Sequence, residues 1–176
     1  MSPRLREVVI NGFAESPAWK SAMKENVFDV LLYLFENYMD EDPEMMPDPD
    51  SIRNELVAAG FPHQDIDKAF SWLESLSYGQ PIRTTIPTFR IYCDEERAKL
   101  DQECRGLLLF LEQTGILTPS NRELVIDRAM ALSANELTLE NLKWIVLMVL
   151  FSQPDQEAAF ARMEDLVYDN VPVALH

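Results

Sequence analysis

The sequence predicts an all-α protein made of two helical clusters, joined by a proline-containing linker that holds at most one short strand. Three observations lead to this fold class. Apolar residues recur with the spacing of amphipathic helices along most of the chain after residue 22. Capping residues, followed by proline or by an acidic residue, mark several helix starts. Only 5 glycines occur among 176 residues, which disfavours a turn-rich β architecture.

The pattern divides the chain into four segments. Residues 1–22 are slightly basic, carry no long apolar run and are interpreted as an N-terminal extension. Residues 23–76 form an N-terminal helical cluster with a hairpin resembling a helix-turn-helix. Residues 77–93 contain two prolines and β-branched and aromatic residues, and form the linker. Residues 94–170 form a C-terminal helical bundle.

The extension is expected to be dispensable for folding. The helix predicted after Met23 has its own cap, Asn26, with Asp29 placed as a capping-box partner. A shortened protein that begins at Met23 should therefore lose less than about 2 kcal/mol of unfolding free energy. Thermal unfolding of the two forms measures the difference, and a larger loss would contradict the interpretation.

The hairpin of the first cluster spans residues 48–76, and its first helix has a capping signal at each end. Asp48 is the expected cap, Pro49 the first helical residue and Gly60 the left-handed terminus. Pro62 lies in the first turn of the next helix. The apolar stripe of that helix is predicted to comprise Ile66, Ala69, Phe70, Leu73 and Leu76, with Trp72 beside it.

The bundle is predicted to contain four helices. The residues expected to cap or open them are, in order, Asp94, Ser120, Thr138 and Pro154. Gly115 closes the first of the four, a long helix over residues 95–114. The apolar residues Trp144, Leu147 and Phe151 are expected to be buried against the face formed by residues 107–111.

Composition and charge disfavour several classes of function. The net charge is −15, so the surface repels nucleic-acid phosphates and anionic membranes and suits a basic partner. The longest apolar run, residues 144–151, is far shorter than a membrane span. With two cysteines and two histidines in no zinc-binding spacing, we expect no metal and no cofactor. Reduced thiols and no signal sequence favour a cytoplasmic protein without membrane association.

The helix pair of residues 48–76 allows three interpretations: DNA reading, protein binding, or a hairpin that only builds the core. A DNA-reading helix needs cations and amides. The second helix offers Lys68 against three acidic residues, Asp65, Asp67 and Glu74. This charge pattern disfavours DNA reading and leaves the other two interpretations open.

Cys104 is the candidate nucleophile that an enzyme would need. No histidine lies near it in sequence, and it falls on the apolar stripe of its helix, which favours a core thiol. The motifs of common hydrolases, nucleotide-binding proteins and metalloproteases do not occur. We therefore expect a protein that is not an enzyme.

Basic residues gather in one stretch, residues 83–105, which holds five of the 15 lysines and arginines. An equal number of acidic residues makes the stretch locally neutral. It is the place where a nucleic-acid contact would belong if one exists, although no tight direct binding is expected.

Several runs of residues carry a resemblance to a known family. "VFDVLLYLFENY", "RIY", "CRGLLLFLEQ" and "NLKWIVLMVLF", in this order and spacing, resemble the bacterial Smg family over residues 26–168. Residues 1–22 and Pro62 depart from the pattern. The resemblance implies a small cytoplasmic bacterial protein without an established activity and without catalytic or cofactor residues to carry over. It also implies a frequent genomic neighbour that processes DNA.

The leading hypothesis is a non-catalytic adaptor or regulator that binds another protein, which we expect to be basic. The alternative is a nucleic-acid-associated regulator that acts through residues 83–105 or through a DNA-processing partner. The residues predicted to form the interaction surface are Trp72, Tyr78, Arg83 and Arg90.

Overall fold

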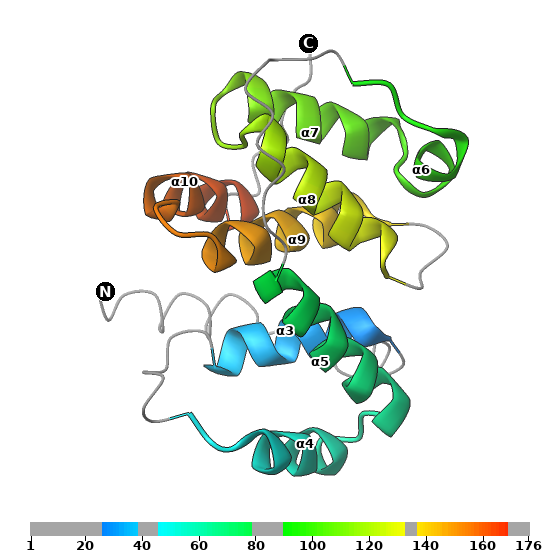
Figure 1. The fold of residues 1–176 in the computed structure, drawn as a ribbon, viewed down its shortest axis with the longest axis vertical. Helices are drawn as coiled ribbons and strands as arrows, with labels where there is room; N and C mark the ends of the chain where they lie inside the picture. The colour runs from blue at the N-terminus through cyan, green and yellow to red at the C-terminus, as the bar shows by residue number, and fades with distance from the viewer. Residues whose placement is uncertain (1–25, 39–45, 79–89, 133–136, 169–176) are drawn as a thin grey trace. The chain divides into compact units, whose positions relative to one another are not determined.

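The fold is all-α, as predicted. The computed structural model describes residues 26–38, 46–78, 90–132 and 137–168, and these contain helices and connections but no strand. The helices are α3 (Val27–Tyr38), α4 (Pro49–Ala58), α5 (His63–Tyr78), α6 (Asp94–Lys99), α7 (Gln102–Gln113), α8 (Pro119–Met130), α9 (Leu139–Ser152) and α10 (Glu157–Tyr168) (Figure 1). No helix in the described parts of the chain is long and apolar enough to cross a membrane.

The chain divides into two compact units, Met1–Ser71 and Trp72–His176. The division falls inside α5, a few residues before the boundary expected at residue 76. Residues 1–22 and most of the predicted linker, residues 79–89, lie outside the described residues. The described end of that linker, residues 90–92, is neither helix nor strand.

The first unit is held together by apolar residues of α3, α4 and the start of α5. Its buried side chains are Val27, Phe28, Val30, Leu31, Leu34, Tyr38, Ile52, Leu56, Ile66 and Ala69. Glu55 of α4 ties these to α3, since its two carboxylate oxygens accept hydrogen bonds from Tyr33 (3.0 Å) and Tyr38 (2.7 Å). A cross-link between aromatic hydroxyls and one carboxylate fixes the register of α3 against α4.

The turn between α4 and α5 has the predicted chemistry. Asp48 caps α4 by accepting a hydrogen bond from the backbone nitrogen of Ser51, and Pro49 is its first residue. Gly60 has a φ of 97°, in the left-handed region that glycine tolerates and other residues rarely adopt. The predicted cap, first residue and left-handed glycine are therefore confirmed, whereas Pro62 precedes α5 and does not lie in its first turn.

Asp29 gives the first unit a pH-dependent weakness. Burial, with a smaller contribution from the charge of Asp65, raises the pKa of Asp29 from 3.8 to about 6. The folded state thus holds the proton more tightly than the unfolded state. Stability is highest below the unfolded pKa and falls as the pH rises toward 6.

Replacing Asp29 with asparagine should consequently stabilise the first unit by about 1 kcal/mol at pH 7, a value reduced for solvent screening. Near pH 3.5 the same substitution should have almost no effect. Urea unfolding at the two pH values measures this. Asp50→Asn, which changes an exposed carboxylate in the first turn of α4, is the matched control. A gain that is equal at both pH values would contradict the assignment.

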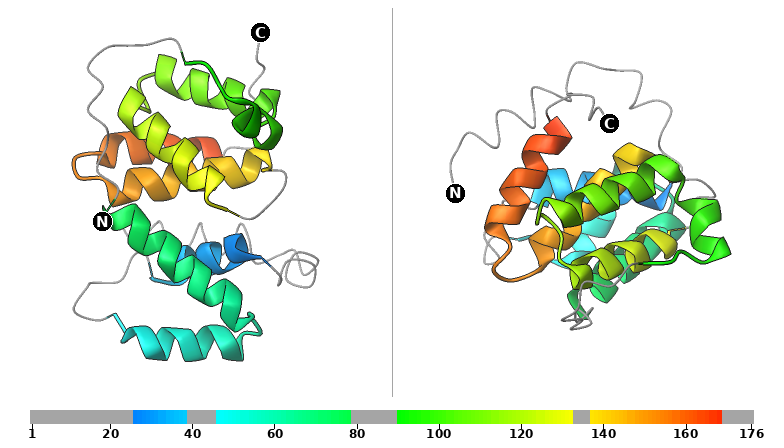
Figure 2. Two further views of the ribbon diagram at one scale, coloured as in Figure 1. Left: turned by 45° about the vertical axis from the view of Figure 1, so that its right-hand side comes forward. Right: turned by 90° about the horizontal axis from the view of Figure 1, so that it is seen from above.

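The second unit is built around α9. This helix packs against α7, α8 and α10 (Figure 2). Every residue from Trp144 to Leu150 is buried. A helix that is buried on all sides needs no polar face, and the apolar run accordingly shows little amphipathic character. Trp144 and Leu147 are buried as predicted, but Phe151 is 45% exposed and that part of the prediction is wrong. Thr138 caps α9 as predicted, accepting a hydrogen bond from the backbone nitrogen of Asn141.

Helix starts in the second unit differ from the predictions at three places. The long helix expected over residues 95–114 is two helices, α6 and α7, and Cys93 rather than Asp94 is the cap of α6. Asp101 interrupts the helix because its carboxylate caps α7, accepting a hydrogen bond from the Cys104 nitrogen at 2.7 Å. The connecting residue, Leu100, is extended and fully buried. Burial of this side chain favours the break over a continuous helix.

The other two differences have local causes. Thr118, not Ser120, caps α8, because Pro119 then occupies the first helical position that suits proline. The last helix, α10, begins at Glu157 and not at Pro154. Asp155 has a φ of 62°, a left-handed conformation that ends any helix started by the proline.

Candidate functional site

Arg90 fixes the extended segment that leads into α6. Its Nε lies 2.8 Å and 3.0 Å from the two carboxylate oxygens of Glu123 in α8. Its two terminal nitrogens lie 2.8 Å and 2.7 Å from the carboxylate oxygens of Glu96 in α6. One guanidinium thus binds two carboxylates, each through two oxygens, which is a geometry that lysine cannot reproduce.

The ion pairs continue from Glu123 into a network. Arg122 donates to Glu123 (2.9 Å) and to Glu112 of α7 (2.5 Å), and its side chain is almost completely buried. We call Arg90, Glu96, Glu112, Arg122 and Glu123 the ion-pair network. It joins residues 90–93 to α6, α7 and α8.

Protonation states in the network are strongly biased toward the charged forms. Hydrogen bonds from Arg90 are the main reason why the pKa of Glu96 falls from 4.5 to about 2, although burial opposes the shift. The pKa of Arg90 is raised, chiefly by its hydrogen bonds to Glu96. Glu96 also accepts a hydrogen bond from the Cys93 backbone nitrogen at 3.0 Å, so it caps α6 as well. The Arg90–Glu96 pair therefore stays charged over the physiological pH range.

Fixing residues 90–93 in this way presents Ile91 to solvent. Its side chain is 84% exposed, the highest value among the large apolar residues that the structure describes. Tyr92, on the other side of the extended backbone, is half-buried beneath Arg90, whose guanidinium carbon lies 4.7 Å from the ring centroid. An exposed isoleucine in a segment held by ion pairs is poorly explained by folding alone.

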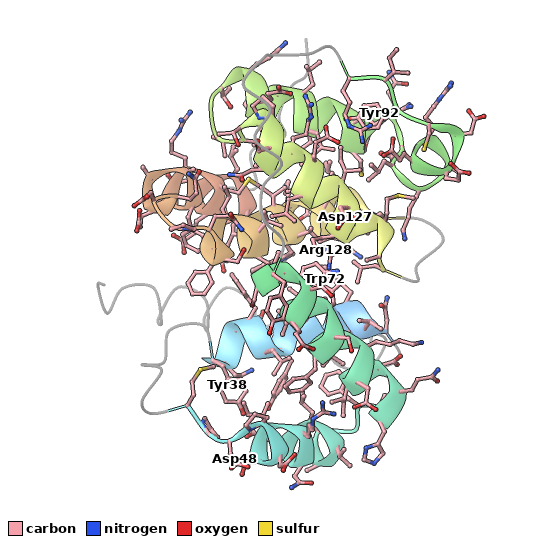
Figure 3. All side chains as sticks on the ribbon, viewed as in Figure 1. Tyr38, Asp48, Trp72, Tyr92, Asp127 and Arg128 are labelled. Carbon is pink, nitrogen blue, oxygen red and sulfur yellow. The ribbon has the colours of Figure 1, made fainter. Side chains whose placement is uncertain are left out.

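Tyr92 lies near α7. The guanidinium carbon of Arg105 in α7 lies 5.9 Å from the centroid of the Tyr92 ring, and Figure 3 shows Tyr92 beside that helix. Leu109 follows Arg105 by one helical turn, on the same side of α7, and is 55% exposed. We call Ile91, Tyr92, Arg105 and Leu109 the Ile91–Leu109 surface.

Acidic residues are frequent in α6 and at the start of α7. The exposed acidic residues of α6 and of the start of α7 are Asp94, Glu95, Asp101 and Glu103. The basic residues of the same stretch are Arg97, which is exposed, and Lys99 and Arg105, which are partly exposed. Exposed acids therefore outnumber exposed bases in α6 and at the start of α7. This charge balance suits a basic protein segment.

The structure describes three of the four residues predicted to form an interaction surface: Trp72, Tyr78 and Arg90. Trp72 is only 4% exposed, and its Nε1 donates a hydrogen bond to the backbone oxygen of Arg128 at 2.9 Å (Figure 3). Tyr78, the last residue of α5, is 76% exposed. Arg90 is committed to the ion-pair network, and Arg83 lies outside the described residues.

The basic residues of residues 83–105 are mostly engaged with protein groups. Lys99 Nζ donates to the backbone oxygens of Met130 (3.1 Å) and Leu132, at the end of α8, and burial lowers its pKa. Arg97 is the exception, with a side chain 60% exposed and its nearest carboxylate 3.7 Å away. Among the described residues 90–105, few cations are thus free to meet a phosphate backbone.

Cys104 has the properties of a core thiol, as predicted. Its side chain is fully buried, and burial raises its pKa to about 12, so that it is protonated and a poor nucleophile. No group of three or more His, Cys, Asp or Glu side chains suited to a metal ion occurs within the described ranges.

Sequence reasoning missed the apolar part of the Ile91–Leu109 surface. Ile91 falls in the predicted linker, and Leu109 lies in an unbroken apolar run, residues 107–111, among buried neighbours. A helical wheel places Leu109 opposite Leu107 and Leu111, and this was the available signal.

Comparison with known proteins identifies relatives over most of the chain. A family model described as "Protein of unknown function (DUF494)" matches residues 27–176. A protein of Methylococcus capsulatus called "Protein Smg homolog" is 63% identical over 155 residues, covering 88% of this chain and 100% of the relative. Proteins with the same name from Nitrosococcus oceani and Thioalkalivibrio sulfidiphilus are 55% and 51% identical, with the same coverage of both chains. No solved structure matches.

Proposed function

This chain belongs to the Smg family, also described as the protein of unknown function DUF494, and from that premise we propose that it is a non-catalytic adaptor or regulator that binds another protein. Its site of contact is the Ile91–Leu109 surface. The partner is a basic protein, and the association takes place in the cytoplasm.

The observation that carries the proposal is the exposure of Ile91 and Leu109 around a segment held by ion pairs. Flexible segments often expose apolar side chains, but they lose conformational entropy when a partner orders them. Here Arg90, Glu96 and Glu123 already hold the segment in one geometry. The surface is thus organised before binding, which is a property of efficient recognition sites.

The chemistry of the described residues supports a non-catalytic function. The candidate nucleophile, Cys104, is protonated and inaccessible. The strongest electrostatic interactions lie within the ion-pair network, where each of the two arginines binds two carboxylates. Such a network stabilises structure and leaves little capacity to exchange protons with a substrate.

Site-specific photo-crosslinking in bacterial cells tests the proposal. A photoreactive residue placed at Leu109 should crosslink to one predominant protein, and the product should disappear when Ile91 is also changed to serine. The matched control position is Val57 in α4, which is 37% exposed in the first unit. Equal products from both positions, or none from position 109, would contradict a docking function for this surface.

Binding to DNA separates the proposal from its alternative, a nucleic-acid-associated regulator. With a net charge of −15 and most of its central cations paired, the isolated protein should bind random duplex DNA no tighter than a typical non-specific binder, at about 10⁻⁴–10⁻⁶ M in physiological salt. Fluorescence anisotropy across a salt series measures this.

Arg83→Ala with Arg97→Ala provides the variant for the DNA experiment, because Arg83 belongs to the basic stretch of the sequence and Arg97 lies outside the ion-pair network. Weak binding that is unchanged in this variant supports the proposal. Submicromolar, steeply salt-dependent binding that the variant abolishes would favour the alternative.

A further inference from the structure

The outward side of α7 consists of residues without charge. At 3.6 residues per turn, residues spaced four, three and four positions apart share one side of a helix. On α7 the side opposite the buried Leu107 and Leu111 carries Gln102, Gly106, Leu109 and Gln113, which we call the α7 strip. Three of these residues are exposed, and Gly106 is partly exposed. In a chain with a net charge of −15, an uncharged helix side suits the centre of a contact with another protein surface.

We infer that the α7 strip is a self-association surface, against which α7 of a second copy of this chain packs in the antiparallel direction. In this arrangement Gln102 comes level with Gln113 of the second copy, and Gly106 comes level with Leu109 of the second copy. Both pairs are centred on the same point of the helix, between residues 107 and 108. Each contact therefore occurs twice, as the two-fold symmetry of a dimer requires.

The residue types of the α7 strip complement one another in these pairs. Gly106 lies inside α7, where glycine is less favourable than alanine by roughly 1 kcal/mol. Without a side chain it leaves room for the exposed Leu109 of the second copy and lets the two backbones come close. A glutamine amide both donates and accepts hydrogen bonds, so Gln102 can pair with Gln113 of the second copy. A second copy of the chain thus fits the strip without leaving a charge uncompensated.

Charges beside the α7 strip favour the antiparallel direction. Arg105 and Glu112 lie seven positions apart and share one flank of the strip. An antiparallel pair brings Arg105 near the level of Glu112 of the second copy, whereas a parallel pair brings each charge level with its own kind. Arg105 also lies by the Tyr92 ring, and Glu112 pairs with Arg122. These charges therefore set the direction more than the strength of the contact.

The dimer is weak and depends on salt. One side of a 12-residue helix is smaller than the roughly 1,200–2,000 Å² that stable interfaces bury. The two copies, each with a net charge of −15, repel one another, and salt screens this repulsion. Self-association should accordingly increase with salt. Because Leu109 also belongs to the Ile91–Leu109 surface, the second copy and the proposed partner exclude each other.

Sedimentation equilibrium of the purified full-length chain, at concentrations up to about 1 mM in low and in high salt, measures self-association. We expect a monomer–dimer equilibrium that shifts toward the dimer in high salt. Leu109→Glu should weaken it at least about tenfold, because two carboxylates would be buried in the contact. Val57→Glu, which adds the same charge at an exposed apolar residue of α4, is the matched control and should not. Gly106→Gln, which fills the gap without adding charge, should also weaken the dimer.

Gln102→Glu with Gln113→Lys tests the direction of packing without changing the net charge. Opposite charges then face each other in an antiparallel pair, and like charges in a parallel pair. The acidic residue lies in the first turn of α7 and the basic residue in the last turn, so both substitutions suit the helix itself. Self-association in low salt should become stronger. Circular dichroism checks that each variant is folded.

Three results would overturn the inference. The first is a chain that stays monomeric at about 1 mM in high salt. The second is a dimer that Leu109→Glu leaves intact, and the third is a dimer that Gln102→Glu with Gln113→Lys does not strengthen. The measurement contains no other protein, so its outcome is independent of the photo-crosslinking test of the proposed function.

Discussion

Replacing Leu147 with alanine is expected to lower the free energy of unfolding of the second unit by about 2–5 kcal/mol. Leu147 is 1% exposed and lies in the middle of α9, whose neighbouring residues Val146 and Met148 are also buried. Truncation removes apolar contacts and leaves a cavity that surrounding residues on all sides cannot fill without moving. Urea unfolding followed by tryptophan fluorescence measures the loss, because Trp144 lies one turn away.

Leu109→Ala is the matched control for this substitution. It removes the same atoms from a leucine that is 55% exposed on α7, and it should change the unfolding free energy by no more than about 0.5 kcal/mol. A loss below about 1 kcal/mol for Leu147→Ala would mean that α9 is not the centre of the core. A large loss for Leu109→Ala would mean that this side chain stabilises the fold and is not kept exposed for a partner.

Replacing Arg90 with alanine is the second substitution expected to have a large effect, with a loss of about 2 kcal/mol. Removing one partner of a fully buried ion pair costs roughly 3–5 kcal/mol, because the remaining charge is left without compensation. Arg90 and Glu96 keep 17% and 15% of their side-chain exposure, and Glu123 retains Arg122 as a partner. The expected loss is therefore smaller than for complete burial.

The pH dependence identifies Glu96 as the group affected. Its folded pKa is depressed to about 2, so its contribution to stability is fully present above its ordinary pKa of 4.5 and is lost as the pH falls toward 2. The difference between the wild type and Arg90→Ala should accordingly shrink between pH 5 and pH 3. A difference that stays constant over this range would contradict the assignment.

Arg90→Lys separates charge from geometry at the same position. Lysine keeps the positive charge but cannot donate to Glu96 and Glu123 through a planar group with several donors. An intermediate loss of stability is expected. If lysine fully restored the wild-type stability, the contacts of Arg90 with both oxygens of each carboxylate would contribute nothing beyond their charge.

Local sequence signals identified the helices whose termini depend on adjacent residues. Asp48 and Thr138 cap α4 and α9 because a short polar side chain reaches the backbone nitrogen three residues later, whatever the rest of the fold does. Gly60 ends its segment because its left-handed conformation is intrinsically accessible. These predictions needed no information about distant residues.

Signals of equal local strength failed where burial decided between them. Asp94 and Asp101 are both acceptable caps, and only the burial of Leu100 between α6 and α7 shows that the chain breaks there. Periodicity likewise placed Phe70 and Leu73 on the stripe of α5, whereas Trp72 is more deeply buried than either. Helical spacing shows which side of a helix is apolar, but it does not decide which of two neighbouring residues lies at the centre of the buried side.

The sequence by itself determined that the protein is helical, acidic and a member of its family, since composition, periodicity and long runs of similar residues are properties of the chain alone. Only the tertiary structure decided which side chains meet. Arg90 and Glu123 are 33 residues apart in the chain, and either could have been a solvated charge. The exposure of Ile91 and Leu109 follows from how α7 packs and from where the ion-pair network holds residues 90–93. The burial of a side chain depends on its contacts with segments that are distant in the chain, and a short stretch of sequence does not show those contacts.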